Sequence, residues 1–502
     1  MRGKKPIATM MIEICTVEKR SQLLSRCQAL QVHTVCQGEQ VPLHATSTAY
    51  RVQPPIGDRQ WAAPELLDTS SRVYDSTVFG PSCPQYVTAV PSVWALDITG
   101  NLIVNYGESL TAGLVAQNSA EDCFTLAIWT PTRATLDSKL PVIHFLTGGG
   151  DVTGGINITQ MPSNWIHRSQ KHIVVTTNYR VNIFGYPNAR GLNGGTNFAL
   201  QDQRKAVERV AENIEAFGGD PMKITLWGQS AGSSATDQYL FAWYQNPIIR
   251  ASISSSGLAI GGGLNQDYTG TNFTFVAKYQ AVASPTQISS LSVCDVFPCR
   301  VLRILQANTR TIKRLSTHLN LQFLSHVKVC LSLPLSLFPI LNKDMLCQHV
   351  QPVDNKFVFS NYTQRYLSHR IAPLPKIIGT TAREASALLP YPIHNASAGP
   401  SPQLIYTHTL ATVCAAHNTS VLRNEIGLAT YRYEWAGNFS NIAPVDWLGA
   451  YHYSDLYMIF GTYLIAPGSI PELEVQTSEG MQDYLLDFIT DPSSLPGRGW
   501  PG

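Results

Sequence analysis

The sequence predicts an α/β protein in which helices flank a central, mostly parallel sheet. Between residues 141 and 256, short apolar runs alternate with longer segments of helical period, which is typical of parallel strands joined by helices. The apolar runs contain few alternating polar residues, as a sheet buried on both faces requires. The chain has 502 residues and is 44% hydrophobic, so it can bury a large core.

The expected elements follow one another along this region. We expect strands and helices, in chain order, at 142–146 (strand), 173–177 (strand), about 197–217 (helix), 224–227 (strand), after 232 (helix) and 251–254 (strand). The helix at about 197–217 has the clearest signal, because apolar residues recur at spacings of three and four from 207 to 217. Gly218 and Gly219 are expected to end it. A further short strand is expected at 375–378.

A Gly-Gln-Ser-Ala-Gly motif at 228–232 directly follows the strand expected at 224–227. Small residues two before and two after a serine allow the tight strand-to-helix turn that exposes its hydroxyl. Such a turn, a nucleophile elbow, places the serine where a histidine and a substrate carbonyl can both reach it. The motif alone arises by chance in about one chain in six of this length. The catalytic interpretation of this motif therefore depends on the other residues of the sequence.

Acyl transfer through Ser230 needs a base, an acid that orients the base, and donors for the oxyanion. Three glycines at 148–150 follow an expected strand, so consecutive backbone amides can turn toward one point. In hydrolases with such an elbow, the acid and then the histidine follow the serine along the chain. His452 precedes an apolar helix and Glu384 follows the strand at 375–378, as this order requires. Either residue alone is as well explained as an ordinary histidine or a helix-end charge.

The chain resembles the type-B carboxylesterase family, the cholinesterase-like branch of the α/β-hydrolase fold, and is most similar to its fungal members. The resemblance spans about residues 50–501. It rests on the elbow, the glycines, Glu384, His452 with Asp455, and ordered motifs: Gln-Pro-Pro-Ile-Gly-Asp at 53–58, Glu-Asp-Cys at 121–123, Asn-Tyr-Arg at 178–180, Asp-Gln-Arg at 202–204 and Phe-Gly-Gly-Asp-Pro at 217–221. It implies Ser230 as nucleophile, His452 as general acid and base, and Glu384 as the carboxylate that holds the imidazole.

The resemblance also implies an oxyanion hole and a disulfide. The oxyanion hole would be built from the backbone amides of Gly149, Gly150 and Ala231. The disulfide would join Cys83 to Cys123. A bridge between Cys294 and Cys299 is a weaker implication, because the loop that it would close is short for the family.

Three residues near the expected site depart from the pattern of the family. Thr147 stands where many relatives carry histidine, and Gln229 replaces the commoner glutamate beside the serine. Neither residue takes part in proton transfer, so activity is expected to survive both changes. Asp151 would place a carboxylate beside the oxyanion hole, where it opposes the developing negative charge unless it points away or is paired.

Residues 46–502 are expected to form one α/β-hydrolase domain, with two anomalous segments. Residues 1–45 are the first, because the expected leader and first strands are not recognisable there. The second is an insertion at about 324–348, which is rich in leucine, serine and proline and has no clear period. We favour translated intron sequence as its interpretation, and a membrane-touching lid is the alternative.

The composition of the chain limits the classes of partner and cofactor that we expect. The net charge is +2 and no block of lysine and arginine occurs, which argues against nucleic acid. No run of about 18 apolar residues occurs, so no transmembrane segment is expected. The ten cysteines follow no C-x-x-C spacing, and the expected chemistry uses only protein groups, so neither a metal nor an organic cofactor is expected.

We expect a secreted glycoprotein, because the chain has a low share of charged residues (14%), ten cysteines and six N-x-S/T sequons. The first 20 residues nevertheless make a poor signal peptide. The sequons begin at Asn157, Asn272, Asn361, Asn395, Asn418 and Asn438.

Together these features predict a serine carboxylic ester hydrolase that acts through an acyl-enzyme on a small-molecule or lipid ester. A catalytically silent, cholinesterase-like interaction protein is the alternative, since fold does not fix function. A peptidase is a more distant third. The complete set of nucleophile, base, acid and glycines favours the hydrolase. The sequence carries no signal for the acyl length or the oligomeric state.

Overall fold

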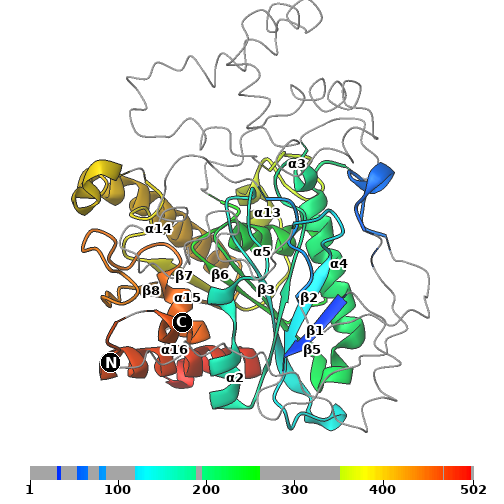
Figure 1. Ribbon diagram of the computed structural model, residues 1–502. Coiled ribbons are helices and arrows are strands. Elements are labelled where there is room, and N and C mark those ends of the chain that lie inside the picture. The colour runs from blue at the N-terminus through cyan, green and yellow to red at the C-terminus, as the bar shows by residue number, and fades with distance from the viewer. Residues whose placement is uncertain are drawn as a thin grey trace, which may run out of the picture.

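The described strands form one twisted sheet in the computed structural model (Figure 1). The structure describes residues 31–35, 52, 54–65, 79–85, 119–187, 195–260, 351–389, 391–466 and 468–498. The strands are β1 (Gln31–Val35), β2 (Thr125–Trp129), β3 (Leu140–Leu146), β4 (Ile173–Thr177), β5 (Gly219–Gln229), β6 (Ala251–Ser255), β7 (Lys376–Thr381) and β8 (Thr430–Trp435). Their order across the sheet is β1-β2-β4-β3-β5-β6-β7-β8. Neighbouring strands are parallel except for β2 and β4, which confirms the predicted class.

Helices connect these strands and lie on both sides of the sheet (Figure 1). The described α-helices are α2 (Ser163–Ser169), α3 (Asn182–Gly185), α4 (Phe198–Asn213), α5 (Ala231–Ala242), α13 (Tyr362–Leu367), α14 (Pro402–Glu425), α15 (Ser454–Phe460) and α16 (Glu472–Thr490). Short 3-10 turns are η2 (Gly57–Arg59), η3 (Leu136–Ser138), η4 (Ile158–Gln160), η5 (Ile214–Phe217), η6 (Ile393–Ala398), η7 (Thr462–Ile465) and η8 (Leu495–Arg498).

The strands and helices expected between residues 141 and 256 are all present. The expected helix at 197–217 is α4 continued by η5, and Gly218 ends it with a left-handed φ of 84°. Such a φ suits a residue without a Cβ. The largest difference from the expectation is β5, which begins at Gly219 rather than at 224. The first residues of β5 are less apolar than the rest, so the hydrophobic pattern predicted only the continuously buried part of the strand, which begins at 224.

Alternate residues of the strands face two hydrophobic cores. Trp227 of β5 faces the core under α2, α15 and α16, where it stacks on Phe460 with ring centroids 5.1 Å apart. Its neighbour Leu226 faces the opposite core, which contains apolar residues of α4, α5 and α13. Because both faces are covered, the sheet is rigid, and the loops at its edges can be held in fixed positions.

The structure describes little of the segments that were expected to be anomalous. Residues 31–35 form β1, which pairs in parallel with β2. The rest of 1–45 and the whole of 324–348 lie outside the described residues. The division into a domain at 46–502 and two anomalous segments therefore stays a prediction.

Candidate active site

The candidate residues meet at one edge of the sheet, where parallel strands end. Leu146 of β3 pairs with Gly228 of β5, and Gln229 pairs with Ser255 of β6. The strand β7 continues this edge, because Ser255 also pairs with its residue Gly379. The segments that follow these strands carry the predicted glycines, the serine and the acid. The carboxyl ends of parallel strands are the usual place for a site in an open α/β sheet.

Ser230 occupies a sharp turn between β5 and α5. Its φ of 56° and ψ of −124° are unusual for a residue with a side chain, and its N–H donates to Ser255 O at 2.9 Å. The two flanking glycines are required by space. A Cβ on Gly228 would collide with the backbone of Gly232, and a Cβ on Gly232 would collide with the carbonyls of Leu146 and Thr147. The segment 228–232 therefore has the geometry of a nucleophile elbow.

Glu384 and His452 form a buried hydrogen-bonded pair. His452 Nδ1 lies 2.6 Å from Glu384 Oε2, and the other carboxylate oxygen accepts the N–H of Thr381 at 2.9 Å. A bridge between Arg383 and Tyr451 fixes this contact, because each of these residues immediately precedes a member of the pair. A carboxylate accepts a hydrogen bond, so Nδ1 carries the proton and Nε2 of the neutral ring carries a lone pair that can accept one.

The structure does not join Ser230 to His452 by a hydrogen bond within the described part of the chain. Instead, the side chain of the preceding residue reaches the imidazole: Gln229 Nε2 lies 3.0 Å from His452 Nε2. Gln229 is 2% exposed and His452 is 6% exposed, so this contact is shielded from water. The residue that precedes the predicted nucleophile thus contacts the predicted base, and its amide is hydrogen-bonded to the ring nitrogen that the base would use.

The glycine loop after β3 packs directly against the elbow. A Cβ on Gly148 would lie 2.6 Å from Ser230 Cβ and 2.5 Å from Gln229 O, so only glycine permits this approach. Gly149 and Gly150 follow with φ values of 128° and 62°. Across the described ranges, no hydrogen bond uses the backbone N–H of Gly149, Gly150 or Ala231. These N–H groups are available to an oxyanion.

A predicted disulfide supports this loop. Cys83 and Cys123 are bonded, with Cα atoms 4.9 Å apart, which confirms the pairing implied by the resemblance. Gln85, two residues from Cys83, accepts hydrogen bonds from Gly154 N–H at 2.6 Å and from the hydroxyl of Thr153 at 2.5 Å. The disulfide therefore anchors a segment that holds the far end of the glycine loop. The pair Cys294 and Cys299 lies outside the described residues.

Asp151 is buried behind the glycine loop and is paired. Its carboxyl accepts a hydrogen bond from Gln351 Nε2 at 3.1 Å and also contacts the hydroxyl of Tyr186. Burial raises the pKa of Asp151 from its ordinary 3.8 to about 7, and the two hydrogen bonds only partly oppose this rise. The carboxylate that sequence reasoning placed against the oxyanion is thus largely neutral below pH 7.

Sequence reasoning missed a second buried layer beneath the pair. Tyr433 of β8 donates its hydroxyl hydrogen to Asp455 Oδ2 at 2.7 Å and lies 3.2 Å from Ser255 Oγ. Trp227 Nε1 donates to the same Ser255 oxygen at 3.0 Å. Burial raises the pKa of Asp455 to about 6. Asp455 had a signal in the motif around His452, but Tyr433 has none because its strand was not predicted.

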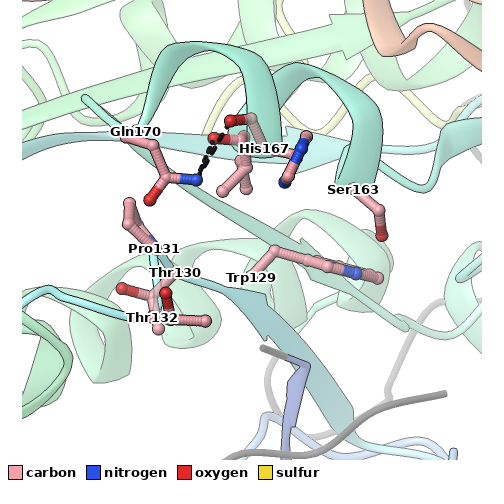
Figure 2. Close-up of a pocket in the computed structure, with 8 residues that line it drawn as sticks. Trp129, Thr130, Pro131, Thr132, Ser163, His167 and Gln170 are labelled. Atoms are coloured by element: carbon pink, nitrogen blue, oxygen red, sulfur yellow. Dashed lines mark hydrogen bonds between the residues drawn. The ribbon is translucent and has the colours of Figure 1, made fainter. Parts of the chain in front are cut away.

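A small hollow elsewhere on the molecule is separate from this edge (Figure 2). It lies between the end of β2 and α2, and its lining includes Trp129 and Gln170. Trp129 pairs with Val174 near the start of β4, whereas Leu126 pairs with Thr177 at the end of β4. The hollow is therefore at the edge of the sheet opposite to Ser230. It takes no part in the candidate site.

Among the residues that the structure describes, no group of three or more histidine, cysteine, aspartate or glutamate side chains is placed to hold a metal ion. None of their helices combines the length and the apolar character needed to cross a membrane.

Comparison with known proteins gives consistent similarities. The sequence model of the Carboxylesterase family matches residues 50–403. Secreted lipase 5 of Gibberella zeae is 35% identical over 474 residues, covering 89% of this chain and 81% of the relative. Chlorogenic acid esterase of Aspergillus niger is 34% identical over 450 residues, covering 89% of this chain and 78% of the relative. A solved PNB esterase structure, 20% identical, aligns with a TM-score of 0.59 over 88% of this chain and 85% of its own. The structural likeness shows the shared α/β-hydrolase fold.

Proposed function

The chain belongs to the carboxylesterase family, and we propose that it hydrolyses esters with Ser230 as nucleophile, His452 as general acid and base, and Glu384 as orienting carboxylate. The reaction class, serine carboxylic ester hydrolysis, follows from the family and its relatives. The observation that carries the assignment of residues is the buried pair of His452 and Glu384 beside the elbow serine. The hydrogen bond of 2.6 Å to the carboxylate supports the tautomer in which Nε2 carries the lone pair that the proposed base needs.

The proposed reaction has two steps. In the first step, Ser230 Oγ attacks the ester carbonyl carbon while its proton moves to His452 Nε2. The carbonyl oxygen becomes an oxyanion, which accepts hydrogen bonds from the free N–H groups of Gly149, Gly150 and Ala231. The imidazolium is stabilised by Glu384 and returns its proton to the departing alcohol. In the second step, water loses a proton to His452 Nε2 and attacks the acyl carbonyl carbon. The bond to Ser230 Oγ then breaks, the imidazolium returns the proton to this oxygen, and the carboxylic acid product leaves.

A small-molecule ester is the substrate class, and its finer identity is a proposal. Relatives are named for lipase and chlorogenic acid esterase activity. We propose that this chain accepts either an aliphatic acyl chain or an aromatic acyl group. A p-nitrophenyl series from acetyl to lauroyl, run beside triacylglycerol and chlorogenic acid, measures the preference. A kcat/KM that rises with chain length supports the first acyl class, and a preference for chlorogenic acid supports the second.

The Ser230→Ala variant tests the assignment of the nucleophile in the same assays. We expect turnover to fall to the background rate while the circular dichroism spectrum stays unchanged. Ser234→Ala is the matched control, because Ser234 lies one turn further along α5 and serves no proposed catalytic role. Turnover of Ser230→Ala near that of the wild type would exclude this serine as the nucleophile.

We also propose that the protein is secreted and glycosylated. Several relatives are named as secreted lipases, and the Cys83–Cys123 disulfide suits an oxidising compartment. The sequon residues Asn361, Asn395, Asn418 and Asn438 are exposed, whereas Asn157 is buried and its side chain accepts hydrogen bonds from Thr159. Expression in a eukaryotic secretory host should therefore give protein in the medium with glycans on these four exposed residues and none on Asn157. Unmodified exposed asparagines, or retention inside the cell, would contradict this proposal.

A further inference from the structure

Gln229 makes a contact that the proposed reaction has to break. Because Nδ1 of His452 faces the carboxylate of Glu384, the neutral ring offers a lone pair at Nε2. The amide nitrogen of Gln229 lies 3.0 Å from that atom and donates to it. The same lone pair has to accept the proton of Ser230 for the serine to become a nucleophile.

The side chain of Gln229 is held in this position from its other end as well. Its Oε1 lies against the glycine loop, because a Cβ on Gly148 would be only 2.7 Å from it. The amide therefore fills the space between the glycine loop and the imidazole. Both groups are buried, so the amide, and not water, is the resting partner of the base.

An amide and a carboxylate at this position have opposite effects on the imidazole. The amide N–H donates to the neutral ring and so favours the unprotonated base. A carboxylate cannot donate, and its charge attracts the imidazolium and so favours the protonated, inactive base. Within the described residues, Glu384 after β7 and Asp455 of α15 are carboxyl groups that act on His452, and a substitution at position 229 removes neither of them.

We propose that Gln229 is a positioning residue, which holds the imidazole of His452 in its unprotonated state at rest and extends esterase activity toward acidic pH. The amide gives up Nε2 when the serine and substrate engage the base. This inference rests on the proposed function, since it requires His452 to be the general base.

The test is the pH dependence of kcat/KM for Gln229→Glu, measured with p-nitrophenyl acetate. The acidic limb of this profile reports protonation of the essential base in the free enzyme. An added carboxylate beside the ring should move this limb upward by about 1 pH unit or more, with activity recovering at alkaline pH. Gln229→Met, which removes the amide without adding charge, should move the limb upward by less. Gln170→Glu adds the same charge in the distant hollow of Figure 2 and should leave the profile unchanged.

Each outcome separates this inference from the proposed function. A Gln229→Glu profile that coincides with the wild type, or a loss of activity that alkaline pH does not restore, would overturn the role of Gln229. If circular dichroism shows that Gln229→Glu does not fold, Gln229→Met is the variant that tests the proposal. An acidic limb of its pH profile that coincides with that of the wild type would then overturn the positioning role of Gln229. Ser230→Ala is run beside them: residual turnover in that variant removes the proposed function itself, whereas its inactivity means that the Gln229 profiles alone decide the role of Gln229.

Discussion

Replacing Asp151 with asparagine should stabilise the protein, and the gain should grow as the pH rises. Asparagine has nearly the shape of aspartic acid, and its carbonyl oxygen can still accept the hydrogen bond from Gln351. Its amide group can still pair with the hydroxyl of Tyr186. The variant therefore keeps the contacts of the neutral carboxyl and removes only its ability to become charged.

The size of the gain follows from the pKa of the buried carboxyl. Burial raises this pKa from 3.8 to about 7, so the folded state favours the protonated form. The stabilisation that this form provides is complete below pH 3.8 and is lost as the pH rises through about 7. Each pH unit corresponds to about 1.4 kcal/mol, which gives an upper limit of about 4 kcal/mol at pH 8. Tyr179 and Tyr186 stay neutral over this range because burial raises their pKa values.

Urea unfolding of wild type and Asp151→Asn at pH 4, 6 and 8 measures this effect. The difference in unfolding free energy should be near zero at pH 4 and reach about 2 to 4 kcal/mol at pH 8. Asp137→Asn is the matched control, because it makes the same substitution at an exposed position in η3. A difference for Asp151→Asn that does not change with pH, or a variant that is less stable than the wild type at pH 8, would show that burial does not raise the pKa of Asp151.

Two further predictions concern the acid and the disulfide. Glu384→Gln should lower kcat/KM about 10³- to 10⁴-fold in the chromogenic ester assay without unfolding the protein. The reason is that an amide does not fix the required tautomer of His452. A loss of less than tenfold would show that Glu384 is not the orienting carboxylate. Replacing Cys83 and Cys123 together by serine opens a loop with a sequence separation of 40 and should lower the free energy of unfolding by about 4 kcal/mol in urea titrations. Unchanged urea midpoints would show that the disulfide contributes nothing to stability.

Sequence patterns predicted the elements that bury a regular apolar face. The strands at 142–146, 173–177 and 251–254 were predicted almost to the residue, because they are short, apolar and buried on both sides of the sheet. The first residues of β5 were missed, since Asp220 and Lys223 interrupt the apolar run there. Tyr433 lies on a strand whose middle residues are polar or partly exposed, so no alternating pattern marked it.

The candidate site residues could be predicted where the order of motifs along the chain constrains them. Contacts between side chains that are distant in the sequence could not be predicted. The order of the motifs excluded the histidines before Ser230, the apolar helix that follows pointed to His452, and the structure pairs that histidine with Glu384. The partners of Asp151 could not be predicted, because Gln351 is 200 residues away in the sequence. The contact of Gln229 with the imidazole depends on the direction of its side chain, which the adjacent residues in the sequence do not determine.

Covalent trapping identifies the residue that attacks the ester. A fluorophosphonate reacts with an activated serine and stays attached, so peptide mass spectrometry locates the nucleophile. We expect a single adduct, on the peptide that contains Ser230, formed in the wild type and in Ser234→Ala but absent from Ser230→Ala. An adduct on another residue, or an unmodified wild type that still hydrolyses esters, would contradict the assignment of Ser230 as the nucleophile.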